Sequence, residues 1–243
     1  MWPVLFSWGD QHVYAYPLFI GLAWGWGFRL SEARLPADLP AGVFRTWFVG
    51  VFVAAWAGAK LLYVLAQDQW APEALLASSG FWLGGGFVFL GGFLAAAAFT
   101  IGAGLITPQL SWRKMSFTVV PLLYAHALGR VGCFLAGCCF GTPTSMPWSV
   151  HLHGADRHPV QIYEALGLAL LGLTLERISR ARLLGAYLLG YGLLRWGLEW
   201  WRGDEIRGLW GGMSLSQWVS LGMMAIAIPV IYRTWGTRPA SPN

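Results

Sequence analysis

Residues 185–205 read GAYLLGYGLLRWGLEWWRGDE, an apolar run interrupted by polar side chains at regular spacing. These polar side chains are Tyr191, Arg195, Glu199 and Arg202. At about 100° per residue, they fall within an arc of about 80° on a helix and form one stripe. An ionisable stripe of this kind does not face lipid, so it lines a polar cavity or meets another polar helix. The structural alternative is an Arg195–Glu199 pair that locks two helices together.

The composition of the whole chain is that of a membrane protein. Of its 243 residues, 56% are hydrophobic and 11% are charged, and the mean hydropathy is +0.53. A soluble domain carries about 25% charged residues, so a soluble globular protein is excluded. The 16 tryptophans exclude a disordered chain. The net charge of +5 does not indicate nucleic-acid binding, because the basic residues are scattered singly between apolar runs.

Seven apolar stretches are predicted to be transmembrane helices, since a helix needs about 20 residues to cross the hydrocarbon core. They cover residues 13–28, 47–66, 81–110, 117–139, 159–175, 183–201 and 209–232. The third stretch is rich in glycine, which indicates either a broken or re-entrant helix or close packing of helices through small residues. The sequence therefore predicts an all-α membrane protein with about seven transmembrane helices, forming a single integral-membrane domain over residues 1–243.

The charges of the loops predict an orientation. Ten basic residues fall in loops on one side of the predicted spans, and Arg157, Arg202 and Arg207 fall on the other side. Because basic loops stay in the cytoplasm, the N-terminus is predicted to lie outside and the C-terminus in the cytoplasm. Six tryptophans are then expected near the outer interface, where aromatic residues gather. They are Trp2, Trp8, Trp70, Trp82, Trp148 and Trp210.

The fourth predicted span carries one charge in its interior. In LLYAHALGRVGCFLAGCCFG, residues 122–141, Arg130 has no acidic residue before it, so its partner comes from another segment or from a ligand. A guanidinium presents a fork of donors that matches two phosphate oxygens, so Arg130 and Arg195 together indicate a phospholipid headgroup site. Lys60 is predicted to extend its amine to the interface. His126, one turn before Arg130, is interpreted as a hydrogen-bonded core residue.

The fifth predicted span begins with HPVQIYE, residues 158–164, where the proline suits a first helical turn. Gln161 and Glu164 share one face of this helix. They are interpreted either as part of the site or as a structural helix start in which Glu164 contacts an arginine.

Three cysteines, Cys133, Cys138 and Cys139, lie within seven residues. Their spacing matches neither a disulfide framework nor a zinc site with paired C-x2-C motifs, so no metal and no cofactor are predicted. On an ideal helix Cys133 and Cys138 lie about 140° apart, so a bridge between them requires non-helical backbone near Gly137. The cysteines are either small apolar fillers or a thiol site.

Four motifs in this order resemble the bacterial phosphatidylglycerol–prolipoprotein diacylglyceryl transferases. They are GRVGCFLAGCCFG (129–141), HPVQIYE (158–164), GYGLLRWGLEWWRGD (190–204) and MSLSQWVSL (213–221). The resemblance implies a multi-pass protein of the bacterial plasma (inner) membrane with seven spans. It also implies the transfer of a diacylglyceryl group from phosphatidylglycerol to the lipobox cysteine of a prolipoprotein signal peptide, with glycerol phosphate leaving. The implied partners are therefore phosphatidylglycerol, the prolipoprotein and membrane lipid, with no nucleic acid.

The resemblance also implies roles for individual residues. The residues implied to be catalytic are Arg130, Tyr191, Arg195 and Glu199, of which Arg130 corresponds to the family's signature arginine. The residues implied to bind substrate are Tyr14, Arg130, His158, Gln161, Glu164 and Arg202.

Several positions depart from the family pattern. The signature G-R-x-G-N-F-x-N-G-E-x-x-G has asparagines where this chain has Cys133 and Ala136, and a glutamate where it has Cys138. The family's His-Gly-Gly, whose histidine is often assigned as the base, is replaced by Leu90-Gly91-Gly92. These departures mark a divergent branch that carries cysteines.

Three functions therefore stay open. In the favoured one, a diacylglyceryl transferase, Arg130 and Arg195 stabilise the departing phosphate. Since Leu90 takes up no proton, deprotonation of the thiol then falls to Glu199, His126 or water. The second is a membrane enzyme that uses its own cysteines, Cys133, Cys138 and Cys139, for transfer or redox chemistry. The third is a catalytically inactive lipid-binding paralogue.

Overall fold

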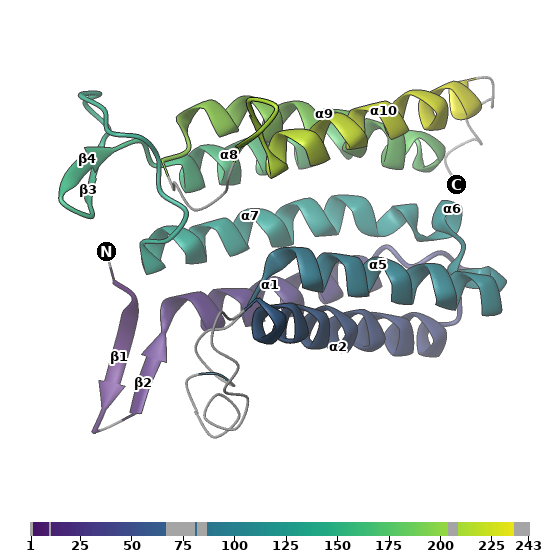
Figure 1. Ribbon diagram of the computed structural model, residues 1–243. Coiled ribbons are helices and arrows are strands. Elements are labelled where there is room, and N and C mark those ends of the chain that lie inside the picture. Colours follow the sequence, from purple (N-terminus) through teal and green to yellow (C-terminus); the bar gives the residue numbers. More distant parts are fainter. Residues whose placement is uncertain (1, 10, 67–80, 82–86, 204–208, 236–243) are drawn as a thin grey trace. The chain divides into compact units, whose positions relative to one another are not determined.

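The computed structural model describes residues 2–9, 11–66, 81, 87–203 and 209–235 (Figure 1). The chain divides into two compact units. The first unit combines residues 1–31 with residues 116–243, and the second consists of residues 32–115. Most described residues of both units are helical, and the first unit also contains three short hairpins. The predicted all-α class is therefore confirmed as a predominantly helical fold.

Five helices form most of the first unit (Figure 1). They are α1 (Ala15–Glu32), α7 (Val119–Ala136), α8 (Val160–Leu175), α9 (Arg180–Leu198) and α10 (Leu215–Trp235). Helix α7 packs on α8, α8 on α9, and α9 on α10. Apolar side chains of α7, α8 and α9 form its buried core, with Leu123 and Leu168 fully buried. Burying such side chains stabilises this packing by about 1.5–3 kcal/mol each.

Two long helices, α2 (Ala41–Leu65) and α5 (Phe89–Ile106), pack against each other in the second unit. A Cβ atom on Gly91 would lie 2.3 Å from the carbonyl oxygen of Gly58, so these two backbones touch. Close packing through small residues therefore explains glycines at the start of α5. The alternative of a broken helix over residues 81–110 includes residues 82–86, which lie outside the described residues. Helix α5 ends at Ile106, and η1 (Pro108–Leu110) and α6 (Trp112–Met115) follow.

Lys60 differs from its sequence-based interpretation. It is 5% exposed, its amine donates to the carbonyl oxygen of Phe81, and it lies 3.7 Å from the ring centroid of Phe87. A carbonyl acceptor and the negative faces of aromatic rings satisfy this ammonium locally. The prediction that Lys60 extends to the interface is therefore wrong.

Three antiparallel hairpins were not predicted. They are β1 (Val4–Trp8) with β2 (Gln11–Tyr14), β3 (Val150–Leu152) with β4 (Ala155–Arg157), and β5 (Leu209–Trp210) with β6 (Met213–Ser214). Two of them replace residues assigned to helices, since Val13 and Tyr14 lie in β2 and residues 209–214 form the third hairpin. The hairpin of β5 and β6 forms because Gly211 and Gly212, with φ angles of 57° and 79°, reverse the direction of the chain.

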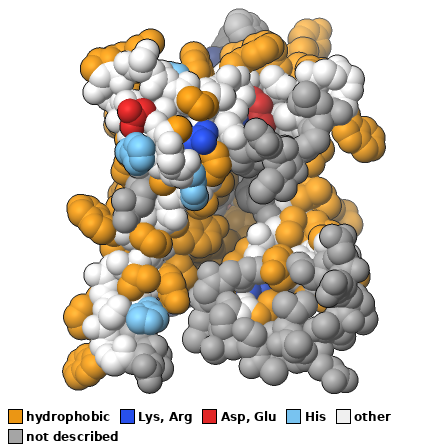
Figure 2. Space-filling model, turned by 60° about the vertical axis from the view of Figure 1, so that its left-hand side comes forward, with side chains coloured by type: hydrophobic (Ala, Val, Ile, Leu, Met, Phe, Trp, Pro, Cys, Tyr) orange, Lys and Arg blue, Asp and Glu red, His pale blue; other side chains and the backbone are white. Residues whose placement is uncertain are grey.

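Three of the described helices are long and apolar enough to cross a membrane, judged by length and composition. They are Ala41–Leu65, Arg113–Ala136 and Leu215–Thr234, and the helices Leu90–Ile106 and Val160–Leu175 are apolar but shorter. Exposed hydrophobic side chains are widespread on the face that Figure 2 shows. Of the six tryptophans expected near the outer interface, Trp2, Trp8, Trp148 and Trp210 are exposed, whereas Trp70 and Trp82 lie outside the described residues.

Candidate active site

The carboxylate of Glu164 joins three helices of the first unit. Glu164 lies in the second turn of α8, which begins after Pro159, and its side chain is 2% exposed. Its Oε1 atom lies 3.0 Å from Nη2 of Arg130 on α7 and accepts a hydrogen bond of 3.1 Å from the hydroxyl of Tyr191 on α9. His126 Nε2 lies 3.8 Å from the same oxygen. These four residues are called the Glu164 cluster below.

Arg130 has donor capacity that the Glu164 cluster does not use. Its Nε atom is buried and has no hydrogen-bond partner among the described residues. An unsatisfied buried donor costs about 1–3 kcal/mol. The guanidinium is therefore suited to accept a further anionic group, since its fork can engage two oxygens at once.

A second ion pair forms where α9 ends. Nη2 of Arg195 lies 2.7 Å from Oε2 of Glu199 and donates a hydrogen bond of 3.0 Å to the hydroxyl of Ser216. The two charged side chains are 9% and 7% exposed. The other oxygen of Glu199 accepts a hydrogen bond of 2.7 Å from the hydroxyl of Ser214. These four residues form the Glu199 cluster, in which Arg195 Nη1 is a further buried donor without a partner among the described residues.

The two clusters interact electrostatically. Arg195 acts on the charge of Glu164, because these two groups lie close together in a buried region. Two guanidiniums and two carboxylates therefore lie within one polar region at the packed surfaces of α7, α8, α9 and α10.

The predicted polar stripe holds only over part of its length. Helix α9 ends at Leu198, Glu199 begins the 3-10 turn η3 (Glu199–Trp201), and Arg202 has extended backbone with φ of −76° and ψ of 133°. The regular helical angle therefore no longer applies at Arg202. Its backbone instead forms a β-bridge with Gly141.

The start of α10 positions the hydroxyls of the Glu199 cluster. The backbone N–H of Ser214 donates to Gln217 Oε1 at 3.0 Å, and the N–H of Gln217 donates to the Ser214 hydroxyl at 3.3 Å. This reciprocal pair is a capping box at a helix N-terminus. The roles of Ser214 and Ser216 were not predicted, although the S-x-x-Q spacing of residues 214–217 is a sequence signal for such a helix start.

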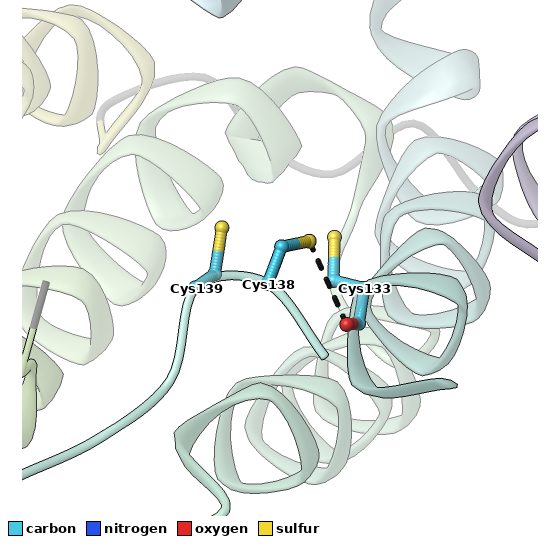
Figure 3. Close-up of side chains that lie close together, drawn as sticks. All are labelled: Cys133, Cys138 and Cys139. Atoms are coloured by element: carbon cyan, nitrogen blue, oxygen red, sulfur yellow. Dashed lines mark hydrogen bonds between the residues drawn. The ribbon is translucent and has the colours of Figure 1, made fainter. Parts of the chain in front are cut away.

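The turn after α7 brings the cysteines together (Figure 3). Gly137 ends the helix with φ of 74°. Side chains from two other segments form hydrogen bonds to the carbonyl groups of the turn. Gln161 Nε2 donates to the carbonyl oxygen of Cys138 at 2.7 Å, and His153 Nε2 lies 2.9 Å from the carbonyl oxygen of Gly137. The three Sγ atoms lie within 4.8 Å of one another, and all three cysteines are free. The backbone at Gly137 is therefore non-helical, which is the condition that a bridge between Cys133 and Cys138 requires, and the fourth predicted span of residues 117–139 ends as a helix at Ala136.

Two other predicted site residues, His158 and Tyr14, also lie outside the two clusters. His158 Nδ1 lies 3.2 Å from the Tyr163 hydroxyl, which also accepts a hydrogen bond from Trp148. Tyr14 lies in β2, is 44% exposed and packs against His12, and no described hydrogen bond joins it to the Glu164 cluster. Leu90 lies in the first turn of α5 in the second unit and is 36% exposed.

Chain segments around the site cross closely at Gly141, which leads to a prediction. A Cβ atom on Gly141 would lie 2.4 Å from the carbonyl oxygen of His158 and 2.9 Å from that of Trp201. Gly141→Ala therefore forces these segments apart, and we expect a destabilisation of about 1–3 kcal/mol. The measurement is denaturant unfolding in detergent. The control is Gly102→Ala, because a Cβ atom at Gly102 meets no atom within 4 Å. Gly154→Ala is less suitable, because Gly154 has a positive φ. Equal stability of the Gly141 and Gly102 variants would contradict the close crossing.

Comparison with known proteins identifies the family. The family model for prolipoprotein diacylglyceryl transferase matches residues 3–233. A relative from Clostridium tetani, named phosphatidylglycerol--prolipoprotein diacylglyceryl transferase, is 33% identical over 181 residues, which cover 68% of this chain and 69% of the relative. Proteins of the same name from Solidesulfovibrio magneticus and Coxiella burnetii are 32% and 30% identical, each over 68% of this chain and 65% of the relative.

These matches confirm the resemblance seen in the motifs. The chain belongs to the prolipoprotein diacylglyceryl transferase family, and it is a transferase. The alternatives of a redox enzyme and of an inactive lipid-binding paralogue are not favoured by these relatives.

Proposed function

We propose that this chain performs its family's reaction, the transfer of a diacylglyceryl group from phosphatidylglycerol to a prolipoprotein, at the Glu164 and Glu199 clusters. The observation that carries the proposal is the pair of guanidiniums, Arg130 and Arg195. Each is held by a carboxylate, and each keeps one buried N–H without a partner among the described residues. A phosphate is the part of phosphatidylglycerol that such a donor pair recognises.

In the proposed reaction the thiolate of the lipobox cysteine attacks the glyceryl carbon next to the phosphate. A sulfur–carbon bond forms, the carbon–oxygen bond to phosphate breaks, and glycerol phosphate leaves with the electron pair. Arg130 and Arg195 stabilise the charge that develops on the phosphate. Glu164 and Tyr191 hold the Arg130 side of the site in place, and Glu199 holds Arg195, so the donors are oriented before the lipid binds.

The proton of the substrate thiol needs an acceptor other than residue 90, which is leucine. One oxygen of Glu199 accepts a hydrogen bond from Ser214, and the other forms an ion pair with Arg195. The contact of His126 with Glu164 is 3.8 Å, longer than a hydrogen bond, and its side chain is 24% exposed. The candidate proton acceptors near the two arginines are therefore His126, Glu199 and water.

We further propose that the chain is a single integral domain that crosses the plasma membrane of a bacterium seven times, with the N-terminus outside. Three helices of spanning length, the loop charges and the exposed tryptophans support this topology. In this arrangement Tyr14, His158, Gln161 and Arg202 lie toward the outer end of the helices, where the prolipoprotein signal peptide and its lipobox approach.

A transfer assay with purified protein tests the proposed function. The full chain in detergent is mixed with labelled phosphatidylglycerol and a lipobox peptide, and the peptide mass is measured. We expect the mass of one diacylglyceryl group to be added, and no addition to a matched peptide whose lipobox cysteine is serine. Lipid binding without any modified peptide would contradict the proposal in favour of an inactive paralogue.

The variant Cys138→Ser separates transfer to a substrate thiol from chemistry on the chain's own thiols. The Sγ atom of Cys138 contacts the carbonyl oxygen of Cys133 at 3.6 Å, a weak interaction that a hydroxyl can replace. We expect the variant to keep transfer activity within about one order of magnitude, because a neutral hydrogen bond is worth about 0.5–1.5 kcal/mol. A fall of several orders of magnitude, measured in the same assay, would instead indicate a nucleophilic cysteine of the enzyme.

A further inference from the structure

The three cysteines at the end of α7 are gathered more closely than their sequence spacing suggests. Cys133 lies in the last turn of α7, and Cys138 and Cys139 lie in the turn beyond Gly137. Figure 3 shows their sulfur atoms on the same side of this turn. Each sulfur lies within 4.8 Å of the other two.

Their exposure argues against a role as apolar fillers. Free cysteines that only fill space are among the most buried residues of proteins. Cys133 is buried, but Cys138 is exposed and Cys139 is partly exposed. The group therefore extends from the protein interior to its surface, as a site that exchanges a ligand with its surroundings requires.

The geometry is close to that of a metal–thiolate centre. With metal–sulfur bonds of about 2.3 Å, two sulfurs on one tetrahedral ion lie about 3.8 Å apart. The longest sulfur–sulfur separation of 4.8 Å thus needs to shorten by about 1 Å. A disulfide needs about 2.05 Å and uses only two of the three sulfurs.

Neighbouring groups also suit such a centre. Gln161 and His153 fix the carbonyl groups of Cys138 and Gly137, so the ligand-bearing turn is held before a metal binds. Arg130 and Arg202 act electrostatically on Cys139, and their positive charge offsets the excess negative charge of three thiolates around one ion.

We propose that Cys133, Cys138 and Cys139 form a three-thiolate site for a thiophilic metal ion, Zn²⁺ or Cu⁺. Thiolates are the protein ligands that select these ions. Each cysteine that coordinates the metal releases its proton to water, and the metal forms a bond to each sulfur without any change of oxidation state. A bound ion ties the end of α7 to the following turn. The proposal does not depend on the transfer activity.

Metal titration of the full-length protein in detergent tests this site. The protein is reduced, freed of metal with a chelator, and titrated anaerobically with Zn²⁺ or Cu⁺ in competition with a chromogenic chelator. We expect one equivalent of Zn²⁺ or of Cu⁺ to bind. Each of Cys133→Ser, Cys138→Ser and Cys139→Ser should weaken binding by more than the roughly 10–100-fold that loss of a supporting residue costs. His151→Ala, in the exposed β3 strand, is the matched control and should bind like the wild type.

Two further measurements use the wild-type protein alone, in case a serine variant fails to fold. The bound metal should protect all three thiols from alkylation, as read by mass spectrometry, and should raise the unfolding temperature. The proposal is overturned if no stoichiometric metal binds, if His151→Ala abolishes binding, or if all three thiols are alkylated equally with and without metal.

Discussion

Arg130→Ala should lower the rate of diacylglyceryl transfer by at least about 100–1,000-fold, the cost of removing one donor that stabilises developing charge. The variant loses the donor fork proposed to hold the lipid phosphate, and it leaves Glu164, 2% exposed, without its arginine. Arg195→Ala is expected to have a comparable effect. Arg130→Lys should restore only part of the activity, because an ammonium lacks the bidentate fork.

The matched control for this prediction is Arg45→Ala. Arg45 also pairs with a glutamate, Glu32, at 2.8 Å, but its side chain is 60% exposed and the pair belongs to the second unit. We expect Arg45→Ala to transfer lipid at nearly the wild-type rate. The quantity to measure is labelled peptide formed per unit time at equal amounts of membrane-inserted protein. Full activity in both Arg130→Ala and Arg195→Ala would rule out the proposed headgroup site.

The second large effect concerns the stability of the Arg195–Glu199 pair. Breaking a buried ion pair by removing one partner costs about 3–5 kcal/mol, because the remaining charge is left uncompensated. Glu199→Gln should therefore destabilise the wild-type chain strongly and an Arg195→Met chain much less. A double-mutant cycle of denaturant unfolding in detergent measures the difference.

The exposed pair Arg45–Glu32 supplies a parallel cycle for comparison. Because solvent screens this pair, its coupling should be about 0–1 kcal/mol. Strictly additive effects of Glu199→Gln and Arg195→Met would show that the pair contributes no coupling, and the site would then need another explanation for its two buried charges.

The sequence was most informative where a charge lies in an apolar run. Arg130 and Arg195 could be selected from sequence because a buried charge requires a partner or a ligand, whatever the details of the fold. Glu164 could be placed on the face it shares with Gln161, but not assigned to Arg130, because their contact joins residues 34 positions apart through the packing of α7 on α8.

The parts that could not be predicted depend on backbone geometry beyond a regular helix. Arg202 was placed on the polar stripe by assuming a constant angle per residue, and the 3-10 turn at Glu199 removes it from that stripe. The convergence of Cys133 with Cys138 depends in the same way on one residue, Gly137, which adopts a left-handed conformation. Periodicity describes the interior of a helix well, where Arg130 and Tyr191 lie, but it does not describe the chain beyond a helix end, where Cys138 and Arg202 lie.

The contacts between Glu199 and the start of α10 bear on how the chain enters the lipid bilayer. A charged side chain costs about 2.5–3.5 kcal/mol on insertion at the centre of an isolated helix and less toward the end of a helix, where Arg195 lies. Helix α9 carries Arg195 and is followed directly by Glu199, and their hydrogen-bond partners Ser214 and Ser216 arrive only with α10. Since α10 is itself apolar enough to cross a membrane, its insertion can bring the polar groups of α9 into the bilayer together with their partners. Under the proposed topology, in which α9 also crosses the membrane, we expect the two helices to enter the bilayer as a pair, and a chain truncated before residue 214 to retain α9 poorly.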